Sequence, residues 1–406
     1  MEPLKELIDH VKSGERKMID QLHQFCEINS GSENLAGLAG MSKVLIDVYT
    51  PLADEIYTRK LPTFTTINMS GHIVQQKCGD ALWIRKRPEL KRRVLLCGHM
   101  DTVYPADSLF QKLRYISDHE INGPGVSDMK GGLIVMLHAL SAFEQNKAAD
   151  KLGWDVLINA DEEIGSPSSS VLFNELAPHY QAALVYEPAM TKNGTLAKNR
   201  KGSGKMTVIA TGKAAHAGRA FYEGRNAICY MAEVITEIHA LNGLRDGVTI
   251  NVGKIAGGDA LNIVPDKAVV KLDIRISLPE DEHWVRQQLN ALVSKLKRPD
   301  YSLQIEGEFA RPVKRVCRST ERLFSRLQSC GEKLALSIDW KDSGGCCDGN
   351  NLASLGLPVL DTLGVRGGHI HSPDEFIVLE SLYERAALSA LLLSDLAQGG
   401  LEDIQS

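Results

Sequence analysis

The sequence predicts an α/β fold in two parts: a large domain with a mostly parallel sheet, and a smaller α+β domain inserted into it. From about residue 40 to 192, short apolar runs alternate with helical segments, which is typical of a parallel sheet covered on both faces. At about residue 200 the order becomes β-α-β-β-α-β, that of a ferredoxin-like module. After about 310 the first pattern returns. The predicted large domain is therefore 1–199 and 311–406, and the insert is 200–310.

The elements of the large domain follow from hydrophobic periodicity. The chain begins with one or two amphipathic helices, because Leu7, Val11, Met18 and Leu22 recur at helical spacing. Short apolar runs predict buried strands, and longer periodic segments predict helices. In chain order these are strand 92–99, helix 131–145, strands 154–161 and 182–188, helix 320–333, strand 357–364 and helix 379–398.

The insert is predicted in the same way. A strand at 205–212 is followed by a helix at 224–241, and two strands come next, at 248–258 and 267–277. A helix at 281–297 and a strand at 301–308 complete the module. Six elements in this order form a small module of their own, inserted into the larger domain.

Composition excludes several classes of protein. The chain has 406 residues and a net charge of −5 with no basic run, which argues against a nucleic-acid partner. No segment approaches about 18 uninterrupted apolar residues, so no membrane span is expected. The first 28 residues are charged throughout and lack the apolar core of a signal peptide. The eight cysteines contain no C-x-x-C pair, so we expect reduced thiols and a cytoplasmic protein.

Imidazoles and carboxylates recur just where apolar runs end. They are His99 with Asp101, Asp128 in GPGVSDMKGG, Glu162 with Glu163 in DEEIGS, Glu187 in VYEP, and His371 in HSPDE. Taken singly, each fits a turn, a cap or a surface charge. Sites in open α/β sheets gather outside the carboxyl ends of strands, so five such features together indicate one site.

The residue types indicate its chemistry. Two imidazoles with several carboxylates and no cysteine suit zinc or a related ion, and the number of carboxylates suggests two ions that share one of them. Such a centre polarises a carbonyl and activates water. The adjacent Glu162 and Glu163 allow one glutamate to bind metal while the other takes the proton of the water.

Taken together, HxD at His99 and Asp101, GPGVSDMKGG, DEEIGS and HSPDE resemble the co-catalytic zinc metallopeptidases of the M20 family over nearly the whole chain. The resemblance implies a zinc-dependent exopeptidase-type catalytic domain with two Zn²⁺, for which Co²⁺ or Mn²⁺ can substitute. It also implies that the insert is a lid, or dimerisation, domain and that the protein is a homodimer through it. An Asp128–Met129 peptide like that of the family would be cis.

The resemblance also implies a role for each residue. Five are implied zinc ligands: His99 and Glu187 on one ion, Glu163 and His371 on the other, and Asp128 bridging both. Asp101 would orient the His99 ring, and Glu162 would be the general base. On an extended segment His369 would face the same way as His371. The family pattern, in which the ligand directly precedes Ser-Pro-Asp-Glu, selects His371.

In the insert, the resemblance singles out His216, Asn262 and Arg275. His216 would reach the site of the other protomer and stabilise the oxyanion, while Asn262 and Arg275 would bind the substrate carboxylate. Gly367 and Gly368 would add backbone N–H groups there. The alternatives remain a turn histidine, a strand-end asparagine and a surface arginine.

The predicted activity is hydrolysis of an amide in a small peptide or N-acyl amino acid with a free carboxylate. The resemblance is greatest to the glutamate carboxypeptidase branch. An N-acyl-amino-acid deacylase of the acetylornithine deacetylase type, a dipeptidase and a non-catalytic relative are the alternatives. Lys198, Arg200 and Lys201 are candidates for a second substrate carboxylate or for a solvated hinge, and Cys346 and Cys347 are expected to be small packed residues.

Overall fold

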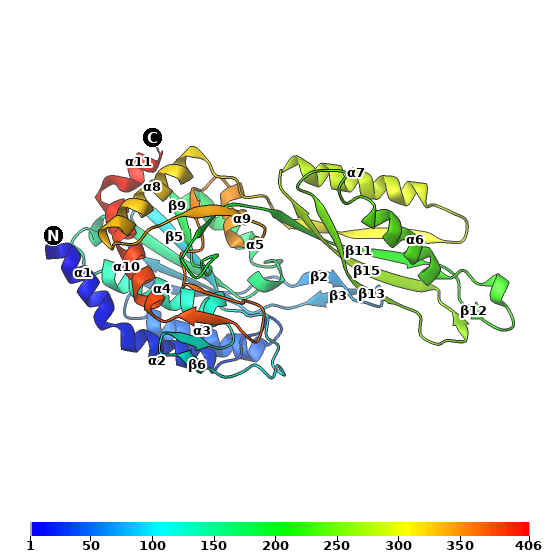
Figure 1. Cartoon of the computed structure of the whole chain (residues 1–406), viewed down its shortest axis with the longest axis horizontal. Coiled ribbons are helices and arrows are strands. Elements are labelled where there is room, and N and C mark those ends of the chain that lie inside the picture. Colours follow the sequence, from blue (N-terminus) through cyan, green and yellow to red (C-terminus); the bar gives the residue numbers. More distant parts are fainter. Residues whose placement is uncertain (1, 406) are drawn as a thin grey trace. The chain divides into compact units, whose positions relative to one another are not determined.

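The structure is a computed structural model that describes residues 2–405. The chain divides into two compact units. The first comprises Met1–Pro62, Cys78–Asn199 and Lys314–Ser406, and the second comprises Thr63–Lys77 and Arg200–Val313. In Figure 1 most of the second unit is the green to yellow part of the chain.

A six-stranded sheet forms the centre of the first unit, in the order β1-β4-β8-β5-β9-β18. Its parallel strands are β8 (Gly153–Asn159), β5 (Arg93–His99), β9 (Ala182–Val185) and β18 (Val359–Leu360). At one edge, β4 (Ala81–Lys86) and β1 (Glu55–Arg59) pair antiparallel. The sheet is therefore mixed. The sequence analysis missed these two strands, because half-exposed strands carry charged residues and lack a continuous apolar run.

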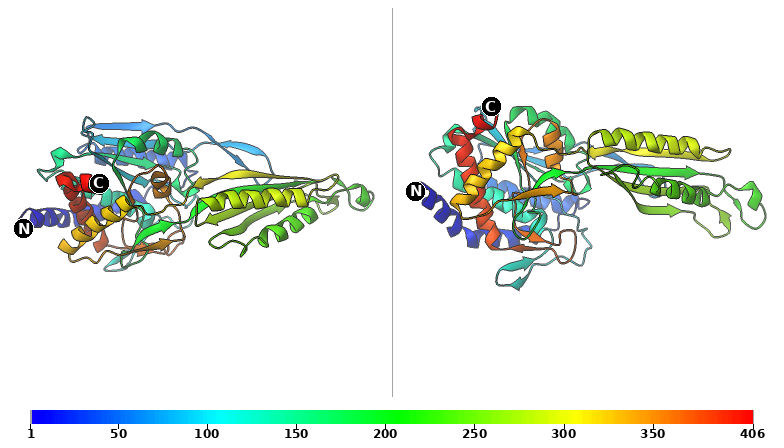
Figure 2. Two further views of the ribbon diagram at one scale, coloured as in Figure 1. Left: turned by 90° about the horizontal axis from the view of Figure 1, so that it is seen from above. Right: turned by 45° about the horizontal axis from the view of Figure 1, so that its top comes forward.

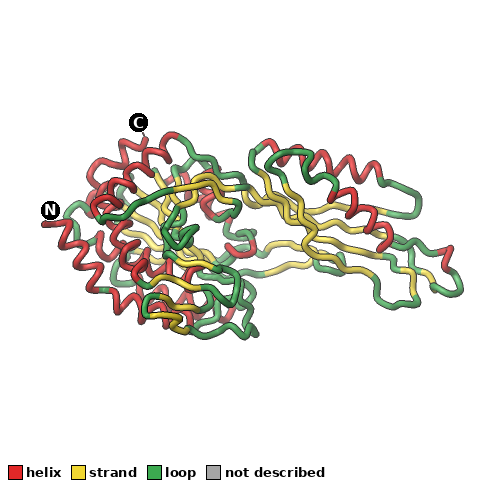
Figure 3. The backbone as a smooth tube through the Cα atoms, viewed as in Figure 1, coloured by secondary structure: helices red, strands yellow, loops and turns green. Residues whose placement is uncertain are grey.

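Helices cover both faces of this sheet, which Figure 3 shows in yellow among red helices. Side chains of β5 alternate between two apolar clusters, with Leu96 in one and Leu95 in the other. The helices of the Leu96 cluster are α1 (Glu2–Ser13), α2 (Glu15–Cys26), α3 (Leu35–Tyr49), α4 (Gly132–Phe143), α8 (Arg318–Lys333), α10 (Glu380–Asp395) and α11 (Leu401–Gln405). On the Leu95 side lie α5 (Ser170–Leu176) and α9 (Asp348–Ser354). Burial of β5 on both faces explains its continuous apolar sequence.

A second sheet in the first unit has the order β19-β20-β7-β6. Its strands are β6 (Arg114–Ser117), β7 (Glu120–Asn122), β19 (Gly367–Gly368) and β20 (Phe376–Val378). A short two-stranded ladder joins β10 (Leu196–Arg200) to β17 (Trp340–Ser343). Because β20 pairs with β7, segments about 250 residues apart in sequence, one before Asp128 and one after His371, lie side by side.

The second unit contains a four-stranded antiparallel sheet, in the order β13-β15-β11-β16, which is ferredoxin-like. The strands are β11 (Gly202–Thr211), β13 (Thr249–Gly257), β15 (Lys267–Ile276) and β16 (Ser302–Arg311). Helices α6 (Ala227–His239) and α7 (Glu280–Lys295) pack on one face, where Val234 and Leu289 meet Val270 (Figure 2). Beyond the end of this sheet, β12 (Ala215–His216) pairs with β14 (Ile263–Val264).

A hairpin of β2 (Phe64–Ile67) and β3 (Ile73–Gln76) also belongs to the second unit, although the sequence analysis included it in 1–199. Ile209 and Val269 alternate along their strands with the residues facing α6, so they point to the opposite face. At Gly71, in the turn of the hairpin, an added Cβ would lie 3.3 Å from Val269 and 3.5 Å from Ile209. The hairpin therefore covers apolar side chains on that face.

Two predictions about chain class can be compared with the described residues. Within 2–405, no helix is both long and apolar enough to cross a membrane. All eight cysteines are free thiols in the structure. Cys347 is buried as the N-cap residue of α9, where its Sγ accepts the Gly349 N–H at 3.3 Å, and this confirms its interpretation as a packed residue.

Candidate metal centre

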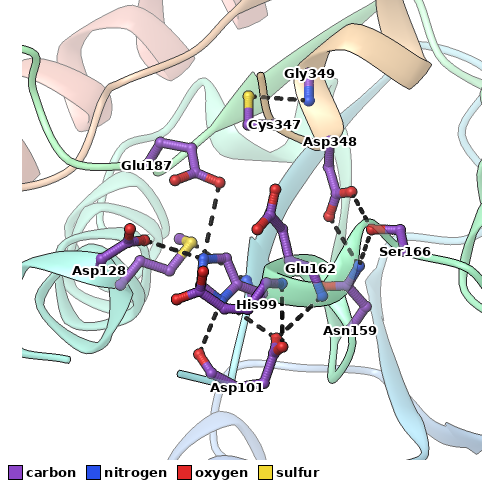
Figure 4. Close-up of polar contacts among 12 residues, drawn as sticks. His99, Asp101, Asp128, Asn159, Glu162, Ser166, Glu187, Cys347, Asp348 and Gly349 are labelled. Atoms are coloured by element: carbon purple, nitrogen blue, oxygen red, sulfur yellow. Dashed lines mark hydrogen bonds and ion pairs between the residues drawn. The ribbon is translucent and has the colours of Figure 1, made fainter. Parts of the chain in front are cut away.

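The carboxyl ends of three parallel strands bring the predicted residues together (Figure 4). His99 is the last residue of β5, Glu162 begins a short 3₁₀ turn (Glu162–Ile164) after β8, and Glu187 lies two residues beyond β9. Since these strands are adjacent and parallel, the polar residues at their carboxyl ends lie close together at the same end of the sheet. Asp128 reaches the same place from the turn Val126–Gly131, which precedes α4.

Asp128 lies between two histidines. Its Oδ1 is 3.2 Å from His99 Nε2, and its Oδ2 is 3.2 Å from His371 Nε2. Glu187 Oε1 is 3.8 Å from His99 Nε2, and Glu163 Oε2 is 3.2 Å from His371 Nε2. Each histidine therefore faces a different oxygen of Asp128, and each has its own further carboxylate.

The histidine motif departs from the expected backbone. His369 and His371 have φ angles of 54° and 62°, so the segment is not extended and the two rings do not face the same way. His371 joins the cluster, whereas the His369 ring lies 5.8 Å from that of Phe376. The condition under which both rings would face the same way is therefore not met, and the residue that lies in the cluster is His371.

Asp101 is fully buried and contacts four neighbouring residues. His99 Nδ1 lies 2.9 Å from the main-chain oxygen of Asp101 and 3.3 Å from its Oδ1. A carbonyl oxygen only accepts, so Nδ1 carries the hydrogen and Nε2 is left to bind a cation. The Asp101 carboxylate also accepts the N–H groups of Glu162 and Glu163, both at 3.2 Å, and the Ser32 hydroxyl at 2.7 Å.

The charges of the cluster are crowded. Burial and the nearby Asp128 raise the pKa of Glu163, while hydrogen bonds to Asp128 and Glu163 raise the pKa of His371 to about 11. Although burial opposes it, hydrogen bonds from His371 and His99 lower the pKa of Asp128. The crowding therefore favours the protonated form of Glu163, whereas the two histidines keep Asp128 ionised.

These residues fit bound metal. Two overlapping groups, His99 with Asp128 and Glu163 and His99 with Glu162 and Glu187, place their ligand atoms within 4.8 Å of one another. Glu163 Oε1 is buried and has no hydrogen-bond partner among the described residues, as expected of an atom that awaits a cation. Imidazole and carboxylate donors without thiolate suit zinc, cobalt or manganese.

The turn that carries Asp128 is stabilised by hydrogen bonds to the carboxylate of Glu375. Gly125 has a φ of +71°, a conformation that favours glycine, and the Asp128–Met129 peptide is cis. The N–H groups of Gly125, Ser127 and Asp128 all point to the Glu375 carboxylate. The sequence analysis quoted Glu375 only as part of HSPDE and gave it no role. Its four-residue offset from His371 was the one signal available.

A second buried network supports the turn that carries Glu162. Asp348 accepts the Ser166 hydroxyl at 2.6 Å and the Asn159 amide at 2.8 Å, and it lies at the start of α9 (Figure 4). The loop SGGCCDGNN thus reaches the carboxyl end of β8 through Asp348. The sequence analysis considered only the cysteines of this loop.

The residues predicted in the second unit lie in two places. His216 and Asn262 are neighbours at the β12–β14 ladder, where the Ala217 N–H donates to the Asn262 carbonyl at 2.9 Å. Arg275 lies near the far end of β15 and pairs with Asp273 at 2.7 Å. The nine residues from Lys267 to Arg275, eight steps along the strand, span about 26 Å, and Asn262 lies beyond Lys267. One chain therefore does not bring Asn262 and Arg275 together.

The remaining candidates have local roles. His216 Nδ1 accepts the N–H groups of Gly218 and Arg219 at 3.1 and 3.2 Å, so a neutral ring carries its hydrogen on Nε2. Gly367 and Gly368 form β19, and a side chain at 367 would collide with the carbonyl oxygen of Phe376.

The three basic residues near the boundary of the two units differ in their exposure. Arg200 is buried, whereas Lys198 and Lys201 are partly exposed. The ammonium of Lys198 lies 5.3 Å from the Trp340 ring centre, and that of Lys201 donates to the Gly247 carbonyl at 3.3 Å. A role for any of them toward a substrate stays a prediction.

Comparison with known proteins gives a consistent result. Residues 95–395 match the sequence profile described as Peptidase family M20/M25/M40. The chain is 26% identical to carboxypeptidase G2 of Pseudomonas sp. (strain RS-16) over 384 residues, which is 94% of this chain and 90% of that protein. It is 27% identical to succinyl-diaminopimelate desuccinylase of Corynebacterium glutamicum over 394 residues, 91% and 99% of the two chains. Among solved structures, the M20 family metallo-carboxypeptidase Sso-CP2 of Sulfolobus solfataricus has the same fold, with a TM-score of 0.75, 16% identity and coverage of 94% and 99%.

Proposed function

The chain belongs to peptidase family M20/M25/M40 and is a hydrolase, and we propose that it cleaves the amide bond of an N-acyl or peptidyl amino acid with a free carboxylate, as a di-zinc glutamate carboxypeptidase. The observation that carries the proposal is Asp128, whose two oxygens each lie 3.2 Å from a different histidine. A carboxylate in this position can bridge two ions. Bound ions would polarise the scissile carbonyl and lower the pKa of the attacking water.

The proposed ligands form two sets around Asp128. His99 and Glu187 belong to one ion, and His371 and Glu163 to the other. Asp101 holds the His99 ring in the tautomer that leaves Nε2 for the metal. This arrangement supports two sites of similar composition, which zinc occupies and cobalt or manganese can fill.

Glu162 is the proposed general base. Its N–H is fixed by Asp101, so its side chain is carried on an anchored turn beside His99 and Glu187. It takes a proton from the attacking water and then delivers that proton to the leaving amine. Its neighbour Glu163 is the proposed metal ligand, so the two glutamates have different roles.

The second unit supplies the proposed contacts to the substrate. His216 carries its ring hydrogen on Nε2, so it can donate to the oxyanion of the tetrahedral intermediate. Asn262 and Arg275 are the proposed contacts to the substrate carboxylate, Arg275 as a two-pronged donor, and the backbone N–H groups of Gly367 and Gly368, in the first unit, are proposed to add to this binding. Because Asn262 precedes β15 and Arg275 lies near its far end, they reach one carboxylate only if two chains contribute. We therefore propose an active homodimer through the second unit.

The choice of glutamate carboxypeptidase rests on the resemblance of the sequence motifs to that branch and on the similarity to carboxypeptidase G2. The second candidate is an N-acyl-amino-acid deacylase, which the similarity to succinyl-diaminopimelate desuccinylase favours. A dipeptidase would use the same chemistry on a different acyl group. These candidates differ only in the substrate groups that flank the amide.

A hydrolysis screen of zinc-loaded protein tests the proposal. The panel compares N-acyl and peptidyl glutamates with N-acetylornithine, N-succinyl-diaminopimelate and simple dipeptides, each with and without a chelator. We expect chelator-sensitive release of glutamate to exceed all other products, and Glu162→Gln to abolish it while keeping the zinc content. Preference for another substrate would contradict the glutamate assignment, and turnover by Glu162→Gln would contradict the assignment of the base.

A further inference from the structure

The Glu375 carboxylate is fully buried and accepts four hydrogen bonds. Its Oε1 accepts the N–H groups of Ser127 at 2.8 Å and Asp128 at 3.0 Å, and its Oε2 accepts the Gly125 N–H at 3.1 Å and the Tyr104 hydroxyl at 2.6 Å. Buried N–H groups that lose their acceptor are costly. The turn that presents Asp128 is therefore organised around one carboxylate.

The same residue ties together the loops on either side of it. The Glu375 main-chain oxygen accepts the Gly123 N–H at 3.2 Å and the Asn122 amide at 2.7 Å. The Tyr104 hydroxyl that contacts Glu375 also lies 2.9 Å from the carbonyl oxygen of Ser372. Since Ser372 directly follows His371, the loop that carries His371 is anchored at the same point.

We propose that Glu375 is a positioning residue that fixes Asp128 relative to His371, and that it sets the metal affinity of the position faced by His371 and Glu163. The inference rests on the proposed metal pair. His371 Nε2 lies 3.2 Å from Asp128 Oδ2, and Glu375 contacts the main chain of one of these residues and belongs to the loop of the other.

The effect is selective for one metal position. His99 and Glu187 come from the ends of β5 and β9, two central strands paired with each other. Their backbone is fixed by the sheet rather than by the Glu375 loop. Loss of Glu375 loosens the position between Asp128 and His371 first, and leaves the position at His99 more nearly intact.

Three variants separate this role from general stability. Glu375→Gln keeps the size of the side chain, but it replaces one accepting oxygen by an N–H donor that faces backbone N–H groups. Tyr104→Phe removes only the hydroxyl that contacts Oε2. Asp374→Asn is the matched control, because it makes the same change of charge at an exposed side chain in the same loop.

The experiment measures zinc affinity by competition titration and records the visible spectrum of the Co²⁺-loaded proteins, together with the thermal unfolding of the metal-free proteins. We expect Glu375→Gln to bind its first equivalent like the wild type and its second at least about ten-fold more weakly, with a changed cobalt spectrum. Tyr104→Phe gives a smaller shift in the same direction and carries the test if Glu375→Gln does not fold. Asp374→Asn behaves like the wild type.

Three results would count against the inference. Equal zinc affinities and an unchanged cobalt spectrum in both Glu375→Gln and Tyr104→Phe would overturn it alone, as would an equal loss of both equivalents in Tyr104→Phe. A wild-type protein that binds fewer than two ions would overturn the proposed metal pair, and the inference with it.

Discussion

Replacing Asp101 with asparagine tests what the carboxylate of Asp101 holds in place. The His99 ring is held chiefly by the main-chain oxygen of Asp101, at 2.9 Å, which the substitution leaves in place. The carboxylate instead anchors the turn of Glu162 and Glu163 through two N–H groups at 3.2 Å, and it accepts the Ser32 hydroxyl at 2.7 Å. We therefore expect Asp101→Asn to disturb the base more than the zinc ligand His99.

The magnitude follows from the count of donors. Asparagine offers one oxygen where Asp101 offers two, so the N–H of either Glu162 or Glu163 must face an amide group. Leaving one buried donor without an acceptor costs about 1–3 kcal/mol of folding free energy. Displacement of groups that orient a metal site lowers activity by about 10- to 100-fold. We expect kcat to fall within that range, with the first zinc retained.

The assay combines steady-state kinetics on the best substrate of the screen, zinc titration, and urea unfolding of the metal-free protein. Asp107→Asn is the control, since it makes the same change at an exposed side chain six residues away. A kcat equal to that of the wild type would refute the role given to the Asp101 carboxylate. Loss of the first zinc would show that the carboxylate, and not the main-chain oxygen, holds His99.

Three further predictions follow from the charges. The pKa values of Glu163 and His371 are raised in the metal-free protein, so zinc binding at pH 7 should release more than one proton per chain. Calorimetry in buffers of different ionisation enthalpy measures the number of protons released. Zero release would contradict the prediction. Burial lowers the pKa of His138 to about 4, so below about pH 6.5 the unfolded chain binds a proton that the folded protein does not bind. The free energy of unfolding should therefore fall by about 2–3 kcal/mol between pH 6.5 and 4. Urea unfolding should show this pH dependence in the wild type and less of it in His138→Gln. The ion pair of Lys314 and Asp361 is buried at 2.6 Å, so Lys314→Met should cost about 3–5 kcal/mol in chemical denaturation and Asp361→Asn in the same chain should recover part of it; no loss in the single variant would contradict this.

Part of the metal cluster could be predicted from the sequence because three of its residues follow strands that are adjacent and parallel in the sheet. His99, Glu162 and Glu187 each lie at or just beyond the end of an apolar run, and parallel strands end at one edge. Glu375 could not be assigned in the same way, since its contacts join segments about 250 residues apart. No local pattern encodes such a pairing.

The conformation of the segment that carries His371 was also beyond the sequence. The positive φ angles at His369 and His371 are rare for residues other than glycine, and no residue pattern in this segment indicates them. The 13-residue spacing of Asn262 and Arg275 is compatible with neighbours in a hairpin. Only the bounds of β15 show that Arg275 lies near the far end of this strand, while Asn262 lies outside it, before its first residue.

The central claim is a pair of metal positions that share Asp128, and zinc stoichiometry tests it most directly. Metal-free protein is titrated with zinc, and bound metal per chain is measured after dialysis for the wild type and for His371→Ala. We predict two zinc ions in the wild type and one in His371→Ala, with His99 holding the ion that remains. One ion or none in the wild type, or two retained in His371→Ala, would contradict the account.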